Sequence, residues 1–430
     1  MQMAVGHIRA LTRDQRNALV ASFLGWTLDA FDYFILVFSI PYIARDFHVP
    51  IPAVTVAVLL TLAMRPVGAF LFGIMADAYG RRSALMIDII LFSLLELLSG
   101  FAPSLTILLV LRALFGIAMG GEWGVGASLA METIPDESRG FFSGVLQSGY
   151  VFGNLLASAV FAIFFPLVGW RGMFIIGALP AVLVIFIRLG VKESPTWERE
   201  REVRQHRERR AERSIWTAIW RNFPLFIYLV VLMTAFNFMS HGTQDLYPTF
   251  LSVQHKLSPQ TVGTIGIIYN VGAIIGCIIF GTYSQRIGRK RAIIIAEVIA
   301  LLLIPLWAFA PSLFLLGLSA FLMQFVIQGA FGVIPAHLNE LSPGSVRGTF
   351  PGLTYQLGNL FASANTTIQA GIAVANGGNY SLALALVTAI ALVVTIVVTA
   401  LGREARDMNF AGEPIEAVQA KTLITAEGKD

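Results

Sequence analysis

An apolar run from Phe223 to Leu251 carries polar side chains that can hold an anion or a proton. Within it, Asn237, His241 and Asp245 are spaced i, i+4, i+8, so in a helix they share one stripe about 12 Å long. If the run spans a membrane, each ionisable group costs roughly 2.5–3.5 kcal/mol to insert. The stripe therefore predicts a functional site, provided that the chain is a membrane protein.

The composition indicates that it is. The 430 residues are 56% hydrophobic and 13% charged, whereas soluble domains carry about 25% charged residues. Apolar runs of the ~20 residues needed to cross a bilayer recur along the chain. We expect about twelve spans, near 18–44, 53–76, 83–101, 105–131, 141–165, 171–190, 223–251, 262–284, 292–310, 312–337, 349–375 and 380–401.

The basic residues between the spans predict the topology. One set of loops holds 24 of the 30 Lys and Arg residues, and the alternate set holds only Arg45, Arg171 and Lys256. By the positive-inside rule, both termini face the cytoplasm and the number of spans is even. We expect a multi-pass protein of the cytoplasmic (inner) membrane. The basic excess is explained by topology, so we expect no nucleic-acid partner.

An internal repeat divides the chain. Phe101-Ala-Pro-Ser-Leu105 recurs at 309–313, an offset of 208, and the same shift aligns glycines, arginines and acids in three further places. We therefore expect an all-α protein of two pseudo-symmetric six-helix bundles. The predicted parts are a first bundle (1–190), a cytoplasmic linker (191–221), a second bundle (222–402) and a cytoplasmic tail (403–430).

The repeat gives the polar stripe a symmetry mate in the first span. Asp29 corresponds to Asn237, and Tyr33 corresponds to His241. Asp29 and Asp32 are spaced i, i+3, and two carboxylates this close cannot easily both stay ionised in a low dielectric. We expect both stripes to face one central cavity, with Asp29, Asp32 and Asp245 as candidates for proton coupling.

Two arginines, Arg65 and Arg112, and two glutamates lie within other spans. Arg65 must be paired with a structural acid or bind the carboxylate of a substrate, which its two parallel N–H donors match. Glu122 could pair with Arg112 or carry a proton, while Glu96 has a weaker claim.

The remaining candidates are amides and an aromatic side chain. Gln356 and Asn359 add two amides to one face of the eleventh span, and Tyr150 could line the cavity or simply pack. There is no P-loop motif and no set of residues spaced for a metal, so we expect no cofactor and transport driven by a gradient.

The loops resemble those of the major facilitator superfamily. Gly73-Ile-Met-Ala-Asp77-Ala-Tyr-Gly80-Arg81-Arg82 is similar to that family's signature between spans two and three, although Ala78 replaces a base. Arg112-Ala-Leu-Phe-Gly116 resembles its fourth-span motif, which implies a general structural or proton-coupling role for Arg112. The resemblance implies the two-bundle fold with substrate held at mid-membrane, and a cytoplasmic latch formed by the first signature.

The polar stripe carries a closer resemblance. The pattern Asn237-x-x-Ser-His241-x-Thr-Gln-Asp245-x-x-x-Thr249 is similar to the seventh-span signature of the yeast lactate/pyruvate–proton permeases, which belong with the sialate:proton symporters. This resemblance implies that Arg65, Gln356 and Asn359 contact substrate. It also implies a functional set of Asn237, His241 and Asp245.

The sequence thus predicts a monomeric proton symporter of small monocarboxylates such as lactate and pyruvate, and no enzyme. The partners are the carboxylate, a proton and membrane lipid. Sialic acid or an aromatic acid is the alternative cargo, and a non-transporting sensor is the alternative class. Whether His241 binds the anion, carries the proton or positions Asp245 stays open.

Overall fold

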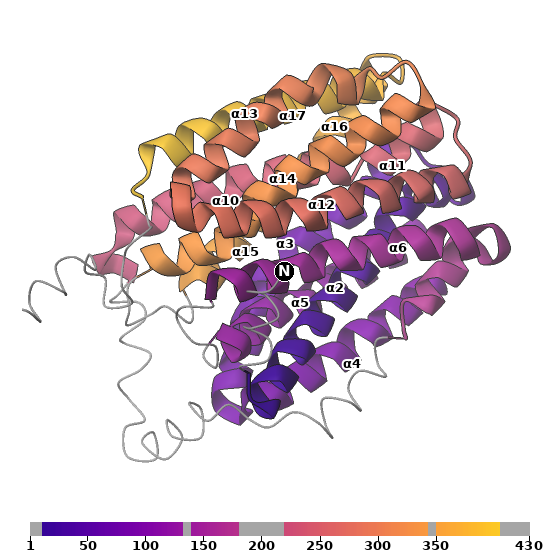
Figure 1. Ribbon diagram of the computed structural model, residues 1–430. Helices are drawn as coiled ribbons and strands as arrows, with labels where there is room; N and C mark the ends of the chain where they lie inside the picture. Colours follow the sequence, from indigo (N-terminus) through magenta and orange to yellow (C-terminus); the bar gives the residue numbers. More distant parts are fainter. Residues whose placement is uncertain (1–10, 132–138, 180–218, 343–349, 405–430) are drawn as a thin grey trace, which may run out of the picture.

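A computed structural model describes residues 11–131, 139–179, 219–342 and 350–404, and these form helices and turns only. Figure 1 shows the helices of the two sequence halves gathered on opposite sides of the molecule. The first half contains α2 (Arg13–Asp46), α3 (Ile51–Tyr79), α4 (Arg81–Gly100), α5 (Leu105–Met131) and α6 (Arg139–Ile176). The second contains α10 (Phe223–Gln244), α11 (Tyr247–Thr249), the π-helical turn η2 (Phe250–Gln254), α12 (Pro259–Ile287), α13 (Arg289–Ala308), α14 (Leu313–Leu341), α15 (Phe350–Ala362), α16 (Asn365–Ala375) and α17 (Tyr380–Leu401).

These helices fall where the hydrophobic runs predict spans. Nine of the described helical segments are long and apolar enough to cross a membrane. The fifth span and the first residues of the sixth lie in α6, on either side of the non-helical residue Gly169, and the predicted sixth span beyond residue 179 lies outside the described residues. The seventh span is built from α10, α11 and η2, and the eleventh is interrupted between α15 and α16. The predicted twelve-span, all-α fold is confirmed.

Local sequence fixes several helix ends. Thr12 and Gln15 form a reciprocal capping box at the start of α2. The Ser258 side chain accepts from the Thr261 N–H at the start of α12, and the Asn379 side chain accepts from the Leu382 N–H at the start of α17. Each cap satisfies a backbone donor that the helix itself leaves without a partner.

The 208-residue repeat is visible in the backbone. His48 and Lys256 are the non-glycine residues with positive φ among those described, at 53° and 55°, and they are 208 residues apart. Gly80 and Gly288 each have a φ of 98°, again at the same offset. The two halves therefore share their turns as well as their spans.

Helix contacts repeat at the same offset. A Cβ on Gly68 would overlap the carbonyl of Ile117 where α3 meets α5, and a Cβ on Gly276 would overlap that of Phe325 where α12 meets α14. Each pair is the other shifted by 208. Glycine lets the backbones approach this closely, as is common between membrane helices.

In each half, polar contacts join the end of the first span to another helix. In the first half Asp46 pairs with Arg171 at 3.2 Å and accepts from the indole of Trp170 at 3.3 Å. In the second half Gln254, the counterpart of Asp46, donates to the Ser381 hydroxyl at 2.8 Å and accepts from its backbone N–H. The position is kept while the chemistry changes from ionic to neutral.

The halves meet along α6 and α12, which lie side by side (Figure 1). A Cβ on Gly263 would lie 2.6 Å from the carbonyl oxygen of Ser158, and the Asn270 amide donates to the Ser158 hydroxyl at 3.4 Å. On α3 and α16, Thr55 donates to Thr367 across the same divide at 3.1 Å. The predicted linker and tail, 191–221 and 403–430, fall largely outside the described residues, so their boundaries stay predictions.

The glycine contacts generate a stability prediction. Gly276→Ala should force α12 away from α14 and lower stability by about 1–3 kcal/mol, the usual cost of overpacking. It is measured as a lower melting temperature of the detergent-purified protein. Gly371→Ala on α16 is the matched control, because nothing lies within 4 Å of its Cβ position and alanine favours a helix. Equal melting temperatures for the two variants would contradict the close-contact role.

Candidate functional site

The predicted arginine of α3 lies at the centre of the molecule in an ion pair. Arg65 Nη2 donates to Asp29 Oδ2 on α2 at 3.1 Å, and both residues are at most 1% exposed. The contact uses one oxygen of the carboxylate. Among the described residues, the Arg65 Nε and the Asp29 Oδ1 have no hydrogen-bond partner. Half of the guanidinium fork is therefore available to a second acceptor.

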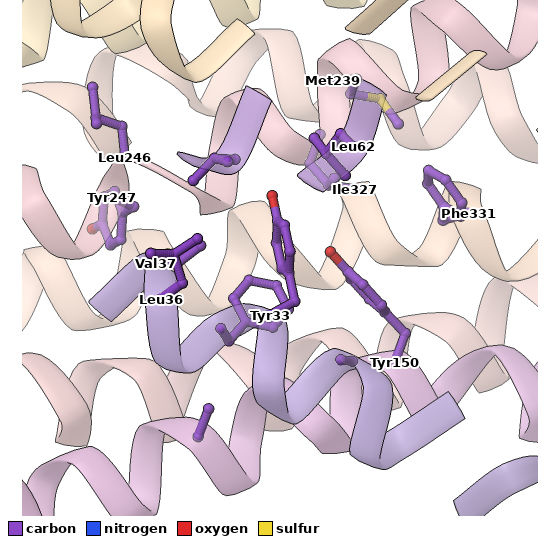
Figure 2. Close-up of a cluster of buried hydrophobic side chains, with 14 of the residues drawn as sticks. Tyr33, Leu36, Val37, Leu62, Tyr150, Met239, Leu246, Tyr247, Ile327 and Phe331 are labelled. Carbon is purple, nitrogen blue, oxygen red and sulfur yellow. The ribbon is translucent and has the colours of Figure 1, made fainter. Parts of the chain in front are cut away.

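Aromatic rings border this pair. The Arg65 guanidinium carbon is 5.9 Å from the centre of the Trp26 ring, and Trp26 packs on Tyr150 of α6 with ring centres 5.5 Å apart. Figure 2 shows Tyr33 and Tyr150 with their hydroxyls projecting to the same side. The buried Tyr150 hydroxyl has no partner among the described residues, whereas that of Tyr33 is fully engaged.

The polar stripe of α10 meets the first half at Tyr33. The Tyr33 hydroxyl donates to Asp245 Oδ2 at 2.7 Å and lies 3.2 Å from His241 Nδ1. His241 Nδ1 is itself 3.0 Å from the same carboxylate oxygen. The Thr366 hydroxyl also donates to Asp245 Oδ2, at 3.0 Å. Tyr33 and His241 are symmetry mates, so the two stripes meet at these side chains, while the central cavity that they were expected to face stays a prediction.

The predicted amides complete the second half of the site. His241 Nε2 lies 3.4 Å from Asn359 Oδ1, and Asn359 Nδ2 donates to Gln356 Oε1 at 3.0 Å. Gln356 Nε2 reaches into the first half and donates to the carbonyl of Gly120 at 3.4 Å. Asn237 donates to the carbonyl of Tyr355 at 3.5 Å. All of these side chains are buried.

Two interrupted helices position these groups. The α-helix of the seventh span ends at Gln244, directly before Asp245, and α16 begins at Asn365, next to Thr366. Irregular backbone at membrane depth is tolerated where it is buried in protein, and it marks ion and substrate sites in many carriers. The breaks bring the Asp245 carboxylate to the N-terminal turn of α16, which favours a negative charge.

A second buried cluster lies inside the first half. Arg112 Nη2 contacts Glu96 Oε2 at 2.7 Å and donates to Ser99 at 2.5 Å. Asp32 lies beside it: a Cβ on Gly177 would be 3.1 Å from both Asp32 Oδ1 and Glu96 Oε1. Asp29 therefore contacts Arg65, whereas Asp32, one turn further along α2, lies beside Glu96.

The cluster carries unbalanced charge. It contains two fully buried carboxyls and one guanidinium, and neither oxygen of Asp32 has a hydrogen-bond partner among the described residues. A buried carboxylate without a partner is far less stable than a protonated carboxyl.

The predicted latch residues are described only in part. Gly73 lies within α3, and Gly80 precedes α4 with its positive φ. Arg82 is partly buried, while the side chains of Asp77, Arg81 and Glu122 lie outside the described residues. In the second copy, Arg289 binds both oxygens of Glu340, at 2.8 and 3.1 Å.

Sequence reasoning missed several members of the site. Thr366 follows a helix break that hydropathy does not reveal, and helical spacing does not identify Glu96 as the partner of Arg112. The Gly120 carbonyl is a backbone group and leaves no sequence signal. No group of three or more His, Cys, Asp or Glu side chains converges as metal ligands within the described ranges.

Comparison with known proteins gives one family and several relatives. The family model described as Major Facilitator Superfamily matches residues 22–366 and also 246–417. The sialic acid transporter NanX of Escherichia coli K12 is 29% identical over 360 residues, 83% of this chain and 87% of that protein. A carboxylic acid transporter protein homolog of Saccharomyces cerevisiae is 29% identical over 389 residues, 86% of this chain but 63% of the longer relative.

A solved structure shares the fold. The xylose transporter XylE of E. coli, in a partially occluded inward open conformation, superposes with a TM-score of 0.74 over 91% of this chain and 99% of that chain. Its sequence identity is 17%, so the likeness concerns the fold alone.

The Arg112 cluster yields a prediction about stability. Arg112→Leu should cost about 3–5 kcal/mol, because it leaves buried carboxyls without a counter-charge. Glu96→Leu should cost less, since Asp32 is close enough to replace Glu96 beside the guanidinium. The melting temperatures of the two purified variants give the comparison. A loss from Glu96→Leu as large as that from Arg112→Leu would show that Asp32 does not share the arginine.

Proposed function

The chain belongs to the major facilitator superfamily, and from that premise we propose that it carries small monocarboxylates, lactate and pyruvate foremost, together with protons. As a member of this family it is a multi-pass membrane transporter and not an enzyme. The cargo, the coupling ion and the residues that handle them are proposals, argued below from the contacts at the centre.

The observation that carries the proposal is the half-occupied guanidinium of Arg65. It is buried between the halves and held by a single oxygen of Asp29, with its Nε free of acceptors. A substrate carboxylate can accept from the unused side of the fork while Asp29 stays bound or moves aside. With one arginine at the centre, a monocarboxylate is a better match than a dicarboxylate.

Neighbouring groups supply the remaining contacts. The free hydroxyl of Tyr150 can donate to a hydroxyl or carbonyl oxygen of the substrate. Among the described residues Asn237 is held by one long hydrogen bond to a backbone carbonyl, and Gln356 and Asn359 lie on α15 of the second half. We assign all four to the substrate site together with Arg65.

The coupling proton is assigned to the His241 and Asp245 pair. The pair lies beside the anion site and is joined to the first half through Tyr33. With Arg65 and Asp29 cancelling each other, a proton taken up here offsets the negative charge of the incoming carboxylate. The net charge of the centre is then the same for the empty carrier and for the carrier loaded with one proton and one anion.

Other acids remain candidates for the proton. Asp29 could take it and release Arg65 to the substrate, and the Asp32 carboxyl has no hydrogen-bond partner among the described residues. Glu122 is retained from the sequence alone. A neutralisation series, in which each acid is replaced by its amide, would separate these alternatives.

The relatives support an acid as cargo. One is named for sialic acid and another for carboxylic acids. Sialic acid or an aromatic acid is therefore the second candidate substrate. From the loop charges we further propose cytoplasmic termini in the inner membrane, with Gly73–Arg82 as the cytoplasmic latch.

The proposal is tested by uptake into proteoliposomes with an imposed pH gradient. Radiolabelled lactate should accumulate when the outside is acidic, and a protonophore should abolish the accumulation. Competition by unlabelled lactate, acetate, benzoate and sialate defines the substrate class. Competition by sialate alone would replace the monocarboxylate assignment, and no uptake of any of these acids would favour the sensor.

Arg65→Lys probes the anion anchor. Lysine keeps the charge but loses the two-pronged geometry, so the KM for lactate should rise about tenfold or more, corresponding to ~1.4 kcal/mol. Arg171→Lys is the control, because that arginine is half exposed beside Asp46 and should keep the wild-type KM. An unchanged KM in Arg65→Lys would remove Arg65 from substrate binding.

A further inference from the structure

A chain of hydrogen bonds crosses from the first half to the imidazole of His241. It starts at the carbonyl of Gly120 on α5, which accepts from Gln356 Nε2 at 3.4 Å. Gln356 Oε1 accepts from Asn359 Nδ2 at 3.0 Å, and Asn359 Oδ1 lies 3.4 Å from His241 Nε2. The other ring nitrogen, Nδ1, lies 3.0 Å from Asp245 Oδ2.

The direction of every bond in this chain is fixed by its first member. A backbone carbonyl can only accept, so Gln356 must turn its NH₂ group to Gly120 and its oxygen to Asn359. Asn359 then donates through its NH₂ group and presents its own oxygen to the ring. An amide oxygen also only accepts. His241 Nε2 therefore has to carry a hydrogen.

The surroundings of Nδ1 demand a hydrogen as well. Tyr33 and Thr366 each give their single hydroxyl hydrogen to Asp245 Oδ2, at 2.7 and 3.0 Å. A bare Nδ1 would place its lone pair against a carboxylate oxygen. An N–H at Nδ1 instead donates to Asp245, with the Tyr33 oxygen as a second acceptor at 3.2 Å. Both ring nitrogens are donors, which is the state of an imidazolium.

We infer that the Gly120 carbonyl, acting through Gln356 and Asn359, holds the transported proton on His241 only while α5 and α15 are in contact. This inference rests on the proposed proton coupling and assigns Gln356 and Asn359 a positioning role in addition to substrate contact. It resolves the role of His241 in favour of carrying the proton, with Asp245 as its counter-ion.

Separation of the halves supplies the release step. Once Gln356 leaves Gly120, both amides are free to turn over, and Asn359 can present its NH₂ group to Nε2. The imidazolium gives its Nε2 proton to water, and the Nε2 lone pair accepts the N–H of Asn359. One proton leaves, and the ring becomes neutral with Nδ1–H still donated to Asp245.

The other charged and titratable groups facing this centre do not displace that assignment. They are Asp29 and Tyr33 on α2, Arg65 on α3, Tyr150 on α6, Asp245 beside α10, Tyr269 on α12 and Tyr355 on α15. Arg65 is compensated by Asp29, so Asp245 is the charge that His241 meets directly. Among the described residues, α14, α16 and α17 contribute amides and hydroxyls to this region and no charge.

Two substitutions of Asn359 test the relay. In Asn359→Asp, a carboxylate at Nε2 accepts in every arrangement, so the pH of half-maximal lactate uptake should move up by ~1 unit or more. In Asn359→Leu, Nε2 has no acceptor, and the midpoint should move down. Opposite shifts from one position are an outcome that a purely structural role would not produce.

Gln324→Leu is the control, since Gln324 binds Thr243 and Gln244 within the second half and lies outside the relay. It should alter the rate without moving the midpoint. Gln356→Leu is the second test variant, and it should lower the midpoint by less than Asn359→Leu does. If Asn359→Leu does not reach the membrane, Gln356→Leu and Asn359→Asp together test the relay. Unchanged midpoints, or shifts in one direction, overturn the relay. A wild-type protein whose uptake ignores the pH gradient overturns the proposed coupling instead.

Discussion

A charged side chain held far from water must have its charge compensated by the protein around it, and the arrangement of this molecule follows from that requirement. Arg65 lies against Asp29, Arg112 against Glu96, and His241 against Asp245. Each pair joins two different elements or spans a helix break. The packing of the helices and the compensation of charge therefore constrain one another.

The two halves share their backbone arrangement but carry different polar side chains at equivalent positions. The position of Arg65 is occupied in the second half by Ala273, and that of His241 is occupied in the first half by Tyr33. The first half thus contributes the guanidinium, and the second half contributes the imidazole with its amides. The symmetric scaffold brings the two sets face to face, while the asymmetric side chains let one set meet an anion and the other a proton.

Much of this could be predicted from sequence, because its causes are local or periodic. Hydropathy marks the spans, and the 208-residue offset makes Tyr33 the counterpart of His241, which it meets in the structure. The partner of Arg65 could not be predicted, since helical spacing tells which residues share a face but not which neighbouring helix that face meets. For the same reason the sequence could not show that Asp29 meets Arg65 while Asp32, one turn away, lies beside Glu96. The break before α16, which delivers Thr366 to Asp245, carries no hydropathy signal.

The Gly120 carbonyl has a consequence for how such a carrier can change over generations. It is part of the main chain, so no substitution deletes this acceptor, and only a displacement of α5 could withdraw it. That displacement is opposed by the close seam with α3, where a Cβ on Gly120 would overlap the backbone of Arg65. Sequence divergence must therefore change the side chains that face this carbonyl, the amides of Gln356 and Asn359, which single substitutions can replace. The acceptor from the first half is thus fixed by the fold, whereas its side-chain partners in the second half are free to vary.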